Sequence, residues 1–298
     1  MDGVLNINKP SGMTSHDVVQ AVRRLLKEKR VGHTGTLDPL ATGVLVLCIG
    51  RAPRIARCLE AGNKEYDAVM RLGVTTDTLD AEGRVLETRS YDPPARSQLL
   101  QAVNTFTGTI MQQPPAFSAV KVAGIPSYKR ARQGNAEPLK PRQVTIHAIE
   151  LAAYDNPLVN LIVRCSKGVY IRSLCADIGE MLGSGAHMAG LVRTRSGRFT
   201  IQKAVTLGTL AEAAAAGSTE QLLVPMDEAL ADFPEIALHA ADADKILHGN
   251  SVLLPEPSSQ GSMQGLIRVH DHAGRLLGLA RTDGTGLRPE LVFSQPRD

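Results

Sequence analysis

The chain has 298 residues, of which 43% are hydrophobic and 21% charged, a composition typical of a globular protein with a sizeable core. Its longest unbroken apolar run, residues 44–49, is far shorter than the roughly 20 residues that a membrane-spanning helix needs. The four cysteines form no C-x-x-C pair, which argues against a zinc knuckle or a disulfide scaffold and favours the reducing cytoplasm. With no Trp, five Tyr and five Phe, a flat base-stacking platform is not expected.

Lysine and arginine exceed the acidic residues by only 33 to 30, but the charges are unevenly distributed. Residues 1–57 hold nine basic and four acidic side chains, residues 115–143 hold six and one, and residues 164–203 hold seven and two. Residues 204–262 reverse the balance, with one basic and nine acidic side chains. The three basic blocks could converge on one surface for a polyanion, but scattered solvated arginines would give the same counts. Charge alone leaves both interpretations open.

The first half of the chain predicts short strands mixed with helices. Residues 3–7 alternate as a strand does, and Ser15 can cap a helix whose apolar stripe runs to Leu26. A glycine-rich loop then leads into a buried strand over 43–49. Further on, the pattern indicates a strand, a helix and a short second helix ended by glycine, at residues 66–72, 97–105 and 127–133.

The second half predicts two strands, a helix, a strand with outward arginines and an alanine-rich helix, at residues 143–154, 158–166, 171–182, 191–199 and 207–216. After Phe233-Pro234, short apolar segments separated by glycine turns indicate a small β-rich appendage. Because no regular βαβ rhythm is present, the fold class is α+β with a mixed, largely antiparallel central sheet flanked by helices. We place the domain boundary at residue 232, between domains 1–232 and 233–298.

Several common cofactor motifs are missing from the sequence. It has neither a Gly-x-Gly-x-x-Gly fingerprint nor a Walker loop, so nucleotide cofactors have no support. It has no His-Glu-x-x-His and no cluster of Asp, Glu and His at ligand spacing, which argues against metal catalysis. We therefore expect neither a cofactor nor a metal.

The segment with the most chemical information is 30–43, which reads R-V-G-H-T-G-T-L-D-P-L-A-T-G. Its glycines predict tight turns, and Pro39 biases Asp38 away from helical backbone angles at the entrance to a core strand. Ordered loops on rigid scaffolds often carry catalytic residues. An isolated Asp-Pro pair is more often an ordinary turn than part of a catalytic loop, so the choice between these two interpretations depends on the rest of the segment.

Segment 30–43 resembles the signature loop of the pseudouridine synthases, in particular the TruB-type branch that modifies the T-loop of bacterial tRNA, and we call it the signature loop below. Three other blocks resemble motifs of the same family: N-K-P-S-G-M-T-S at 8–15, the segments at 64–73 and 75–83, and S-K-G-V-Y-I-R-S-L at 166–174. Residues 113–121, Q-P-P-A-F-S-A-V-K, resemble the start of the insertion that grips RNA in this branch. The resemblance extends from residue 3 to about residue 200.

The resemblance implies a pseudouridine synthase fold over 1–232, with an RNA-gripping insertion at about 114–142 and a PUA-like RNA-binding domain over 233–298. It implies isomerisation of uridine to pseudouridine at position 55 in the T-loop of tRNA, without guide RNA, metal or cofactor. The form of the first motif and the insertion favour the stand-alone branch over the guide-RNA-dependent one. We expect a cytoplasmic monomer that binds the tRNA T-arm and no membrane.

The resemblance also assigns roles to individual residues. Asp38 would be the catalytic aspartate, and its chemistry requires an ionised carboxylate in a dry pocket, where a charge must be paired. Arg172 is the natural partner, because a guanidinium stays charged and can hold a carboxylate through two hydrogen bonds. Tyr66 would stack on the target base, and Tyr170 and Leu191 would line the same pocket. Whether Asp38 attacks the substrate or removes the C2′ proton stays open.

The RNA itself would be bound by basic residues and by one histidine. His33 would occupy the space that the target base vacates when it flips out of the RNA, a step that costs a few kcal/mol. The positive side chains expected to contact RNA are Lys9, Lys121, Arg130, Arg132 and Lys167.

Two other functions compete with catalysis on RNA. A non-catalytic RNA-binding or RNA-folding protein could keep the same scaffold, but it would not need a buried carboxylate facing the RNA. A small-molecule hydrolase is disfavoured because the sequence has no nucleophile elbow and no metal cluster.

Overall fold

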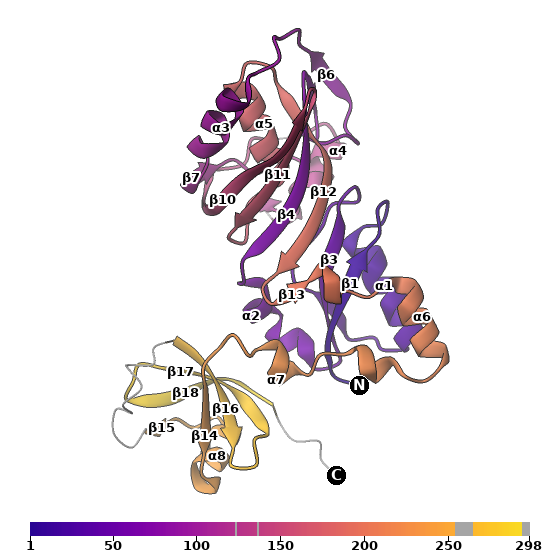
Figure 1. Ribbon diagram of the computed structural model, residues 1–298. Coiled ribbons are helices and arrows are strands. Elements are labelled where there is room, and N and C mark those ends of the chain that lie inside the picture. The colour runs from indigo at the N-terminus through magenta and orange to yellow at the C-terminus, as the bar shows by residue number, and fades with distance from the viewer. Residues whose placement is uncertain (123, 136, 254–264, 294–298) are drawn as a thin grey trace. The chain divides into compact units, whose positions relative to one another are not determined.

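The protein is described here by a computed structural model that covers residues 1–122, 124–135, 137–253 and 265–293. The chain forms two compact units, one of residues 5–222 and one of residues 1–4 together with 223–298 (Figure 1). Among the described residues, no helix is long and apolar enough to cross a membrane.

The elements up to residue 222 are strands and helices in irregular alternation. The first part of the chain contains β1 (Gly3–Lys9), α1 (Ser15–Leu26), β2 (Val31–His33), β3 (Thr42–Ile49), α2 (Ala56–Glu60), β4 (Lys64–Leu72), β5 (Val74–Thr76), β6 (Val85–Thr88), α3 (Arg96–Thr105) and β7 (Gly108–Gln112). The second part contains β8 (Lys121–Val122), β9 (Ile125–Pro126), α4 (Ser127–Arg132), β10 (Arg142–Asp155), β11 (Leu158–Cys165), α5 (Ile171–Met181), β12 (Ala186–Ser196), β13 (Phe199–Thr200) and α6 (Leu207–Ala215).

One sheet organises this large unit. Its strand order is β1-β3-β12-β4-β11-β10-β7, with β2 added on β3 and β13 on β12. The pairs β12–β4, β4–β11, β11–β10 and β10–β7 are antiparallel, and β3 runs parallel to β12. The expected α+β class with a mixed, largely antiparallel sheet is therefore confirmed. The parallel β3–β12 pair matters most for function, because it joins the end of the signature loop to the middle of the sheet.

Burial explains the different sequence patterns of the two neighbouring strands. Every residue of β3 after Thr42 is buried, which matches its uninterrupted apolar run. Along β4, buried residues alternate with more exposed ones, which is the pattern of a strand that has one face in the core. Tyr66 lies on the buried face of β4, and the exposed Asp67 follows it on the other face.

Helix α1 begins one residue earlier than expected. Thr14, and not Ser15, is its N-cap: the Thr14 hydroxyl accepts from the backbone N–H of Asp17 at 3.1 Å, and the Asp17 carboxylate accepts from the backbone N–H of Thr14 at 2.9 Å. Ser15 is buried instead and bonds to the signature loop, as described below. The physical reason is that either hydroxyl can cap the helix, and the acid at 17 selects Thr14.

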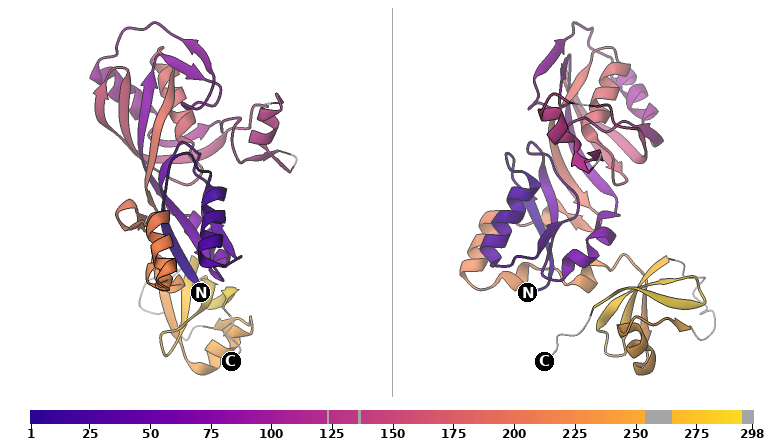
Figure 2. Two further views of the ribbon diagram at one scale, coloured as in Figure 1. Left: turned by 90° about the vertical axis from the view of Figure 1, so that its right-hand side faces the viewer. Right: turned by 180° about the vertical axis from the view of Figure 1, so that it is seen from behind.

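The helices cover the sheet in two groups (Figure 1). Helix α5 packs against β12 and β4, while α3 packs against α5 and β10. Helix α1 packs against α6 and β2. The segment with β8, β9 and α4 stands out from the body of the large unit, as the left view of Figure 2 shows. This segment lies within the range expected to be the RNA-gripping insertion.

The second unit has its own sheet, with strand order β14-β16-β17-β18-β15. Its elements are α7 (Met226–Ala229), β14 (Glu235–Leu238), α8 (Ala240–Leu247), β15 (Val252–Leu253), β16 (Gly265–Asp271), β17 (Leu276–Thr282) and β18 (Gly286–Val292). Helix α8 packs against four of these strands and contributes Ala243 and Ile246 to their core. The sequence pattern predicted only the strands. It missed α8, since an eight-residue helix has too few turns for a clear period.

Candidate active site

The signature loop is fixed on both sides of Asp38 by bonds to the first residue of α1 and to the segment that precedes this helix. The hydroxyl of Ser15 donates to the carbonyl of Leu37 at 3.1 Å and accepts from the Leu37 N–H at 2.8 Å. On the other side, the Pro39 carbonyl accepts from the Gly12 N–H at 3.0 Å and from Lys9 Nζ at 3.2 Å. The backbone that carries Asp38 is therefore held at the residue before it and the residue after it.

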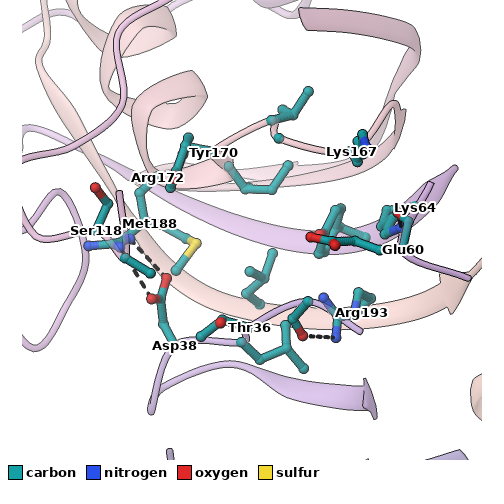
Figure 3. A pocket seen from close by; sticks show the side chains of 18 residues that line it. Thr36, Asp38, Glu60, Lys64, Ser118, Lys167, Tyr170, Arg172, Met188 and Arg193 are labelled. Carbon is teal, nitrogen blue, oxygen red and sulfur yellow. Dashed lines mark hydrogen bonds and ion pairs between the residues drawn. The ribbon is translucent and has the colours of Figure 1, made fainter. Parts of the chain in front are cut away.

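Asp38 forms an ion pair with Arg172, the second residue of α5 (Figure 3). Arg172 Nε lies 3.0 Å from Oδ2 of Asp38, and Arg172 Nη2 donates to Oδ1 at 3.2 Å. The Arg172 side chain is only 5% exposed, whereas that of Asp38 is 35% exposed. The pair predicted from the sequence is present, and the carboxylate keeps an accessible side.

Arg172 is shared between Asp38 and a second carboxylate, which sequence reasoning missed. Arg172 Nη1 lies 3.4 Å from Oδ2 of the buried Asp80 and donates to the Thr78 carbonyl at 2.9 Å. Nη2 also donates to the Phe117 carbonyl at 2.8 Å. The guanidinium is thus held from several directions and orients the Asp38 carboxylate.

Opposing effects act on the ionisation of Asp38. Desolvation raises the pKa of Asp38 above the ordinary value of 3.8, and the nearby Asp80 carboxylate raises this pKa further. The Arg172 guanidinium and the Lys9 ammonium oppose the rise but do not cancel it. An ionised Asp38 is therefore less stabilised by its surroundings than a carboxylate in water, and its proton affinity is higher.

Asp38 and Arg172 lie at one end of a cavity of about 240 Å³ (Figure 3). The cavity brings together six of the residues predicted from the sequence: Asp38, Tyr66, Lys167, Tyr170, Arg172 and Leu191. Lys167 is exposed at its edge, while Tyr66 and Leu191 are buried. Tyr170 is anchored by Gln112, whose side chain accepts from the Tyr170 N–H at 2.7 Å and donates to the Tyr170 carbonyl at 3.0 Å. The backbone of Tyr170 is therefore held by the last residue of β7.

Besides Lys9, which is described below, four other predicted residues lie outside the lining of this cavity. His33 is half-buried and pairs with Leu47 in the β2–β3 ladder, and burial lowers the pKa of its imidazole. Lys121, Arg130 and Arg132 lie on the segment that contains β8, β9 and α4. Arg130 forms an ion pair with Glu137, and the Arg132 guanidinium lies 5.7 Å from the centre of the Tyr128 ring. Their part in RNA binding stays a prediction.

Lys9 requires a correction, because it was expected to contact RNA. Its side chain is fully buried, and Nζ donates to the carbonyls of Pro10, Met13 and Pro39 at 2.9, 2.6 and 3.2 Å. Burial lowers the pKa of Lys9 to about 8, although Asp38 favours its charged form. A fully buried ammonium with three carbonyl acceptors has no donor left for a phosphate. Lys9 instead fixes the turn that supports Pro39.

Arg193 requires a second correction, because the arginines of its strand were expected to face outward. Its side chain is buried and lines the cavity, whereas Arg195 is exposed. A register shift in the β12–β4 pairing lies between these two residues, so the simple alternation of a strand does not apply there. Such a bulge has no clear signal in a single sequence.

No group of three or more His, Cys, Asp or Glu side chains that could hold a metal ion occurs among the residues that the structure describes. The charged groups of the cavity are instead carboxylates, amines and guanidinia, from Asp38, Glu60, Lys64, Lys167, Arg172 and Arg193. This set can orient an organic substrate and stabilise charge on it.

Comparison with known proteins shows which family the chain resembles. Residues 23–171 match the N-terminal domain of the TruB family pseudouridylate synthases, residues 172–231 match the tRNA pseudouridylate synthase B C-terminal domain, and residues 234–293 match a further TruB C-terminal domain. A protein of Pseudomonas paraeruginosa named tRNA pseudouridine synthase B is 43% identical over 96% of this chain and 93% of its own length. A protein of the same name from Burkholderia mallei is 45% identical over 97% of this chain and 96% of its own length.

Among solved structures, an archaeal box H/ACA sRNP Nop10-Cbf5 complex contains a chain with a TM-score of 0.74 and 29% identity, over 99% of this chain and 87% of that one. A chain of an H/ACA RNP bound to a substrate RNA containing 2′-deoxyuridine gives a TM-score of 0.76 and 28% identity, over 99% of this chain and 86% of that one. The sequence and structural comparisons agree with the resemblance found in the motifs. The chain belongs to the TruB family of pseudouridylate synthases and is a pseudouridine synthase.

Proposed function

We propose that the protein converts uridine to pseudouridine at position 55 in the T-loop of tRNA, without a guide RNA. The observation that carries this proposal is the Asp38–Arg172 ion pair on a rigid loop, at the end of a cavity with Tyr66 on its wall. Relatives that share more than two fifths of their residues with the chain over nearly its whole length carry the name tRNA pseudouridine synthase B. The T-loop position rests on the resemblance of the motifs.

The reaction breaks the bond between N1 and C1′, joins C1′ to C5, removes the proton of C5 and leaves a proton on N1. Asp38 acts in its ionised form on the ribose–base unit, and Arg172 keeps it ionised and oriented. Tyr66 stacks on the uracil ring, while Tyr170 and Leu191 complete the walls around it. The proposed steps use side chains of the chain itself, and the proposal includes no cofactor.

The target base must leave the RNA stack to reach Asp38, at a cost of a few kcal/mol. His33 fills the vacated position, and phosphate contacts from Lys121, Arg130, Arg132 and Lys167 offset part of the cost. The exposed position of Lys167 at the edge of the cavity is suited to such a contact.

The direct test uses an unmodified tRNA transcript. After incubation with the protein, pseudouridine is mapped by carbodiimide modification and reverse transcription, and we expect one new stop that corresponds to position 55. A transcript with cytidine at that position is the matched control. Modification at another uridine would contradict the position, and no modification at any uridine would contradict catalysis on tRNA.

Binding of tRNA should weaken steeply as salt concentration rises, because each neutralised phosphate releases condensed counterions. The double substitution Lys121→Ala with Arg132→Ala should reduce the slope of log K against log salt by about 1.5, as expected for two lost contacts. Filter binding over a salt series measures the slope. An unchanged slope would mean that these two side chains do not contact phosphate.

The single-turnover rate at saturating tRNA should fall on acidification with a midpoint above pH 3.8, the ordinary pKa of an aspartate. The sign follows from burial, which raises the pKa of Asp38, so protonation inactivates the site at a higher pH. Asp80→Asn should move the midpoint toward lower pH, because the Asp80 charge contributes to the rise. Circular dichroism at each pH shows that the protein is folded, and a midpoint at or below pH 3.8 would contradict the role of Asp38.

We further propose that residues 1–232 hold the whole catalytic centre and that residues 233–298 form a PUA-like accessory domain for RNA binding. Every residue of the cavity lies before position 200. Truncation after Asp232 should therefore weaken tRNA binding but keep the single-turnover rate at saturating tRNA. If the truncated protein is folded by circular dichroism and yet its saturated rate falls by orders of magnitude, the C-terminal domain is part of the catalytic unit.

A further inference from the structure

Arg193 is a buried cation without a buried counter-charge. Its side chain is only 2% exposed, and in the described part of the chain it forms no ion pair with a carboxylate. Its two side-chain hydrogen bonds in the described part of the chain are to backbone carbonyls: Nε donates to Val44 at 2.7 Å and Nη2 donates to Gly35 at 3.2 Å. Burial of a charged guanidinium costs several kcal/mol of desolvation free energy. The presence of one in the cavity wall therefore suggests that it has a specific role.

Arg193 also has Tyr66 as a neighbour on the same face of the sheet. The two residues face each other directly across the antiparallel β12–β4 pair, and both line the cavity. Side chains at directly opposite positions on one face of a sheet lie within contact distance. The guanidinium lies close enough to the Tyr66 phenol to affect its ionisation. Arg193 therefore connects the phenol of β4 with the Gly35 carbonyl of the signature loop.

The backbone at Arg193 is held as firmly as its side chain. Arg193 pairs with Gly43 across the parallel β12–β3 seam, and Gly43 has a φ of 98°. A Cβ at Gly43 would collide with the backbone carbonyl oxygen of Arg193 and with its backbone nitrogen. Glycine thus permits a close approach of the two strands that fixes where the Arg193 side chain starts. The guanidinium has little freedom to move away from Tyr66 and Gly35.

We propose that Arg193 is a positioning residue of the active site, which ties the Tyr66 phenol to the loop that carries Asp38 and so holds the two sides of the uracil-binding cavity at a fixed spacing. This inference rests on the proposed function, because it gives Tyr66 and Asp38 their roles toward the base. In this role Arg193 does not act on the reacting atoms directly. It acts through the phenol and through the Gly35 carbonyl.

The interaction has an electrostatic consequence that can be measured without RNA. Burial raises the pKa of the Tyr66 phenol, and the Arg193 guanidinium opposes this rise because it favours the phenolate. Removal of the guanidinium should therefore raise the pKa of Tyr66 further. A structural role of Arg193 elsewhere in the fold would leave this pKa unchanged.

The first experiment places 3,5-difluorotyrosine at position 66 of the full chain, which brings the phenol's titration into an accessible pH range and supplies a fluorine resonance. We expect the titration midpoint in Arg193→Met to lie at least about one pH unit above that of the parent protein. Arg195→Met, two residues along the strand and exposed, is the matched control and should leave the midpoint unchanged. Equal midpoints in the parent and in Arg193→Met would overturn the proposal.

The second experiment is a double-mutant cycle on the single-turnover rate at saturating tRNA. Arg193→Met should lower the rate about tenfold or more in the parent, but about twofold at most in the Tyr66→Phe background, because the shared contact is already lost. Equal fold losses in both backgrounds would contradict action through Tyr66. If Arg193→Met does not fold, Arg193→Lys serves instead, since it keeps the charge but replaces the planar fork of guanidinium donors by a single ammonium.

The two experiments separate this inference from the proposed function. The fluorine titration reports the coupling of Arg193 to Tyr66 whether or not the protein modifies tRNA. A shifted midpoint together with no pseudouridine in any transcript would leave the coupling standing and remove the proposed function. An unshifted midpoint with normal pseudouridine formation would overturn the coupling of Arg193 to Tyr66 and leave the proposed function standing.

Discussion

Asp38→Asn is expected to lower the single-turnover rate of pseudouridine formation by about 10⁴-fold or more, with the affinity for tRNA nearly unchanged. The amide has the shape of the carboxylate and can still accept from Arg172 Nη2, so the cavity keeps its form. It has no negative charge and no basicity, so neither attack on the substrate nor removal of the C2′ proton is possible. Rapid quench at saturating tRNA measures the rate, and filter binding measures the affinity.

Asp67→Asn is the matched control for this substitution. Asp67 follows Tyr66 on β4 but lies on the exposed face of the strand, so it should change neither rate nor affinity. Product formation by Asp38→Asn at a rate near that of the parent would show that the catalytic carboxylate lies elsewhere. A hundredfold loss of affinity with the rate preserved would assign Asp38 to RNA binding.

Arg172→Met should have the second largest effect, because it leaves two carboxylates without their shared counter-charge. Removal of one partner from a buried ion pair costs about 3–5 kcal/mol, and the Asp80 side chain is only 6% exposed. Because Asp38 is partly exposed, we expect a loss of unfolding free energy near the lower end, about 3 kcal/mol. The rate should fall about 10²-fold or more, as preorganised charge stabilisation is lost.

The same substitution should also move the acid midpoint of the rate to higher pH. Arg172 lowers the pKa of Asp38, so its removal lets the raised pKa rise further, and a larger fraction of Asp38 is protonated near neutral pH. Urea unfolding and the pH dependence of the single-turnover rate measure the two effects. Arg164→Met is the control, since Arg164 is paired with Glu65 at the surface and should cost less than about 1 kcal/mol. An unchanged acid midpoint in Arg172→Met would contradict the coupling to Asp38.

Much of the fold and of the site follows from local sequence patterns. The uninterrupted apolar run of β3 and the alternation along β4 reflect burial on two faces and on one face, which is a local property. The partnership of Asp38 with Arg172 follows from the need to pair a desolvated charge, together with motifs that placed both residues in one site. These inferences required no knowledge of how the strands are ordered.

The residues that were missed depend on contacts between distant segments. From the sequence, Lys9 is expected to contact RNA. Only the structure shows that its ammonium donates to carbonyls of the protein, among them Pro39, and so is not available to a phosphate. Asp80 lies in a polar turn, and its role appears when α5 brings Arg172 against it. Arg193 faces inward with Leu191, two residues before it, and the register shift that follows Arg193 leaves only Arg195 exposed. In each case a tertiary contact overrides a local pattern.

The central claim is tested most directly by release of tritium from a tRNA transcript labelled at C5 of its uridines. Formation of pseudouridine breaks the C5–H bond of the modified base, so under single-turnover conditions the protein should release the tritium of one uridine per transcript. A transcript in which cytidine replaces uridine 55 should release none. Release that persists from this second transcript would contradict the T-loop position, and no release from either transcript would contradict the isomerisation of tRNA uridine.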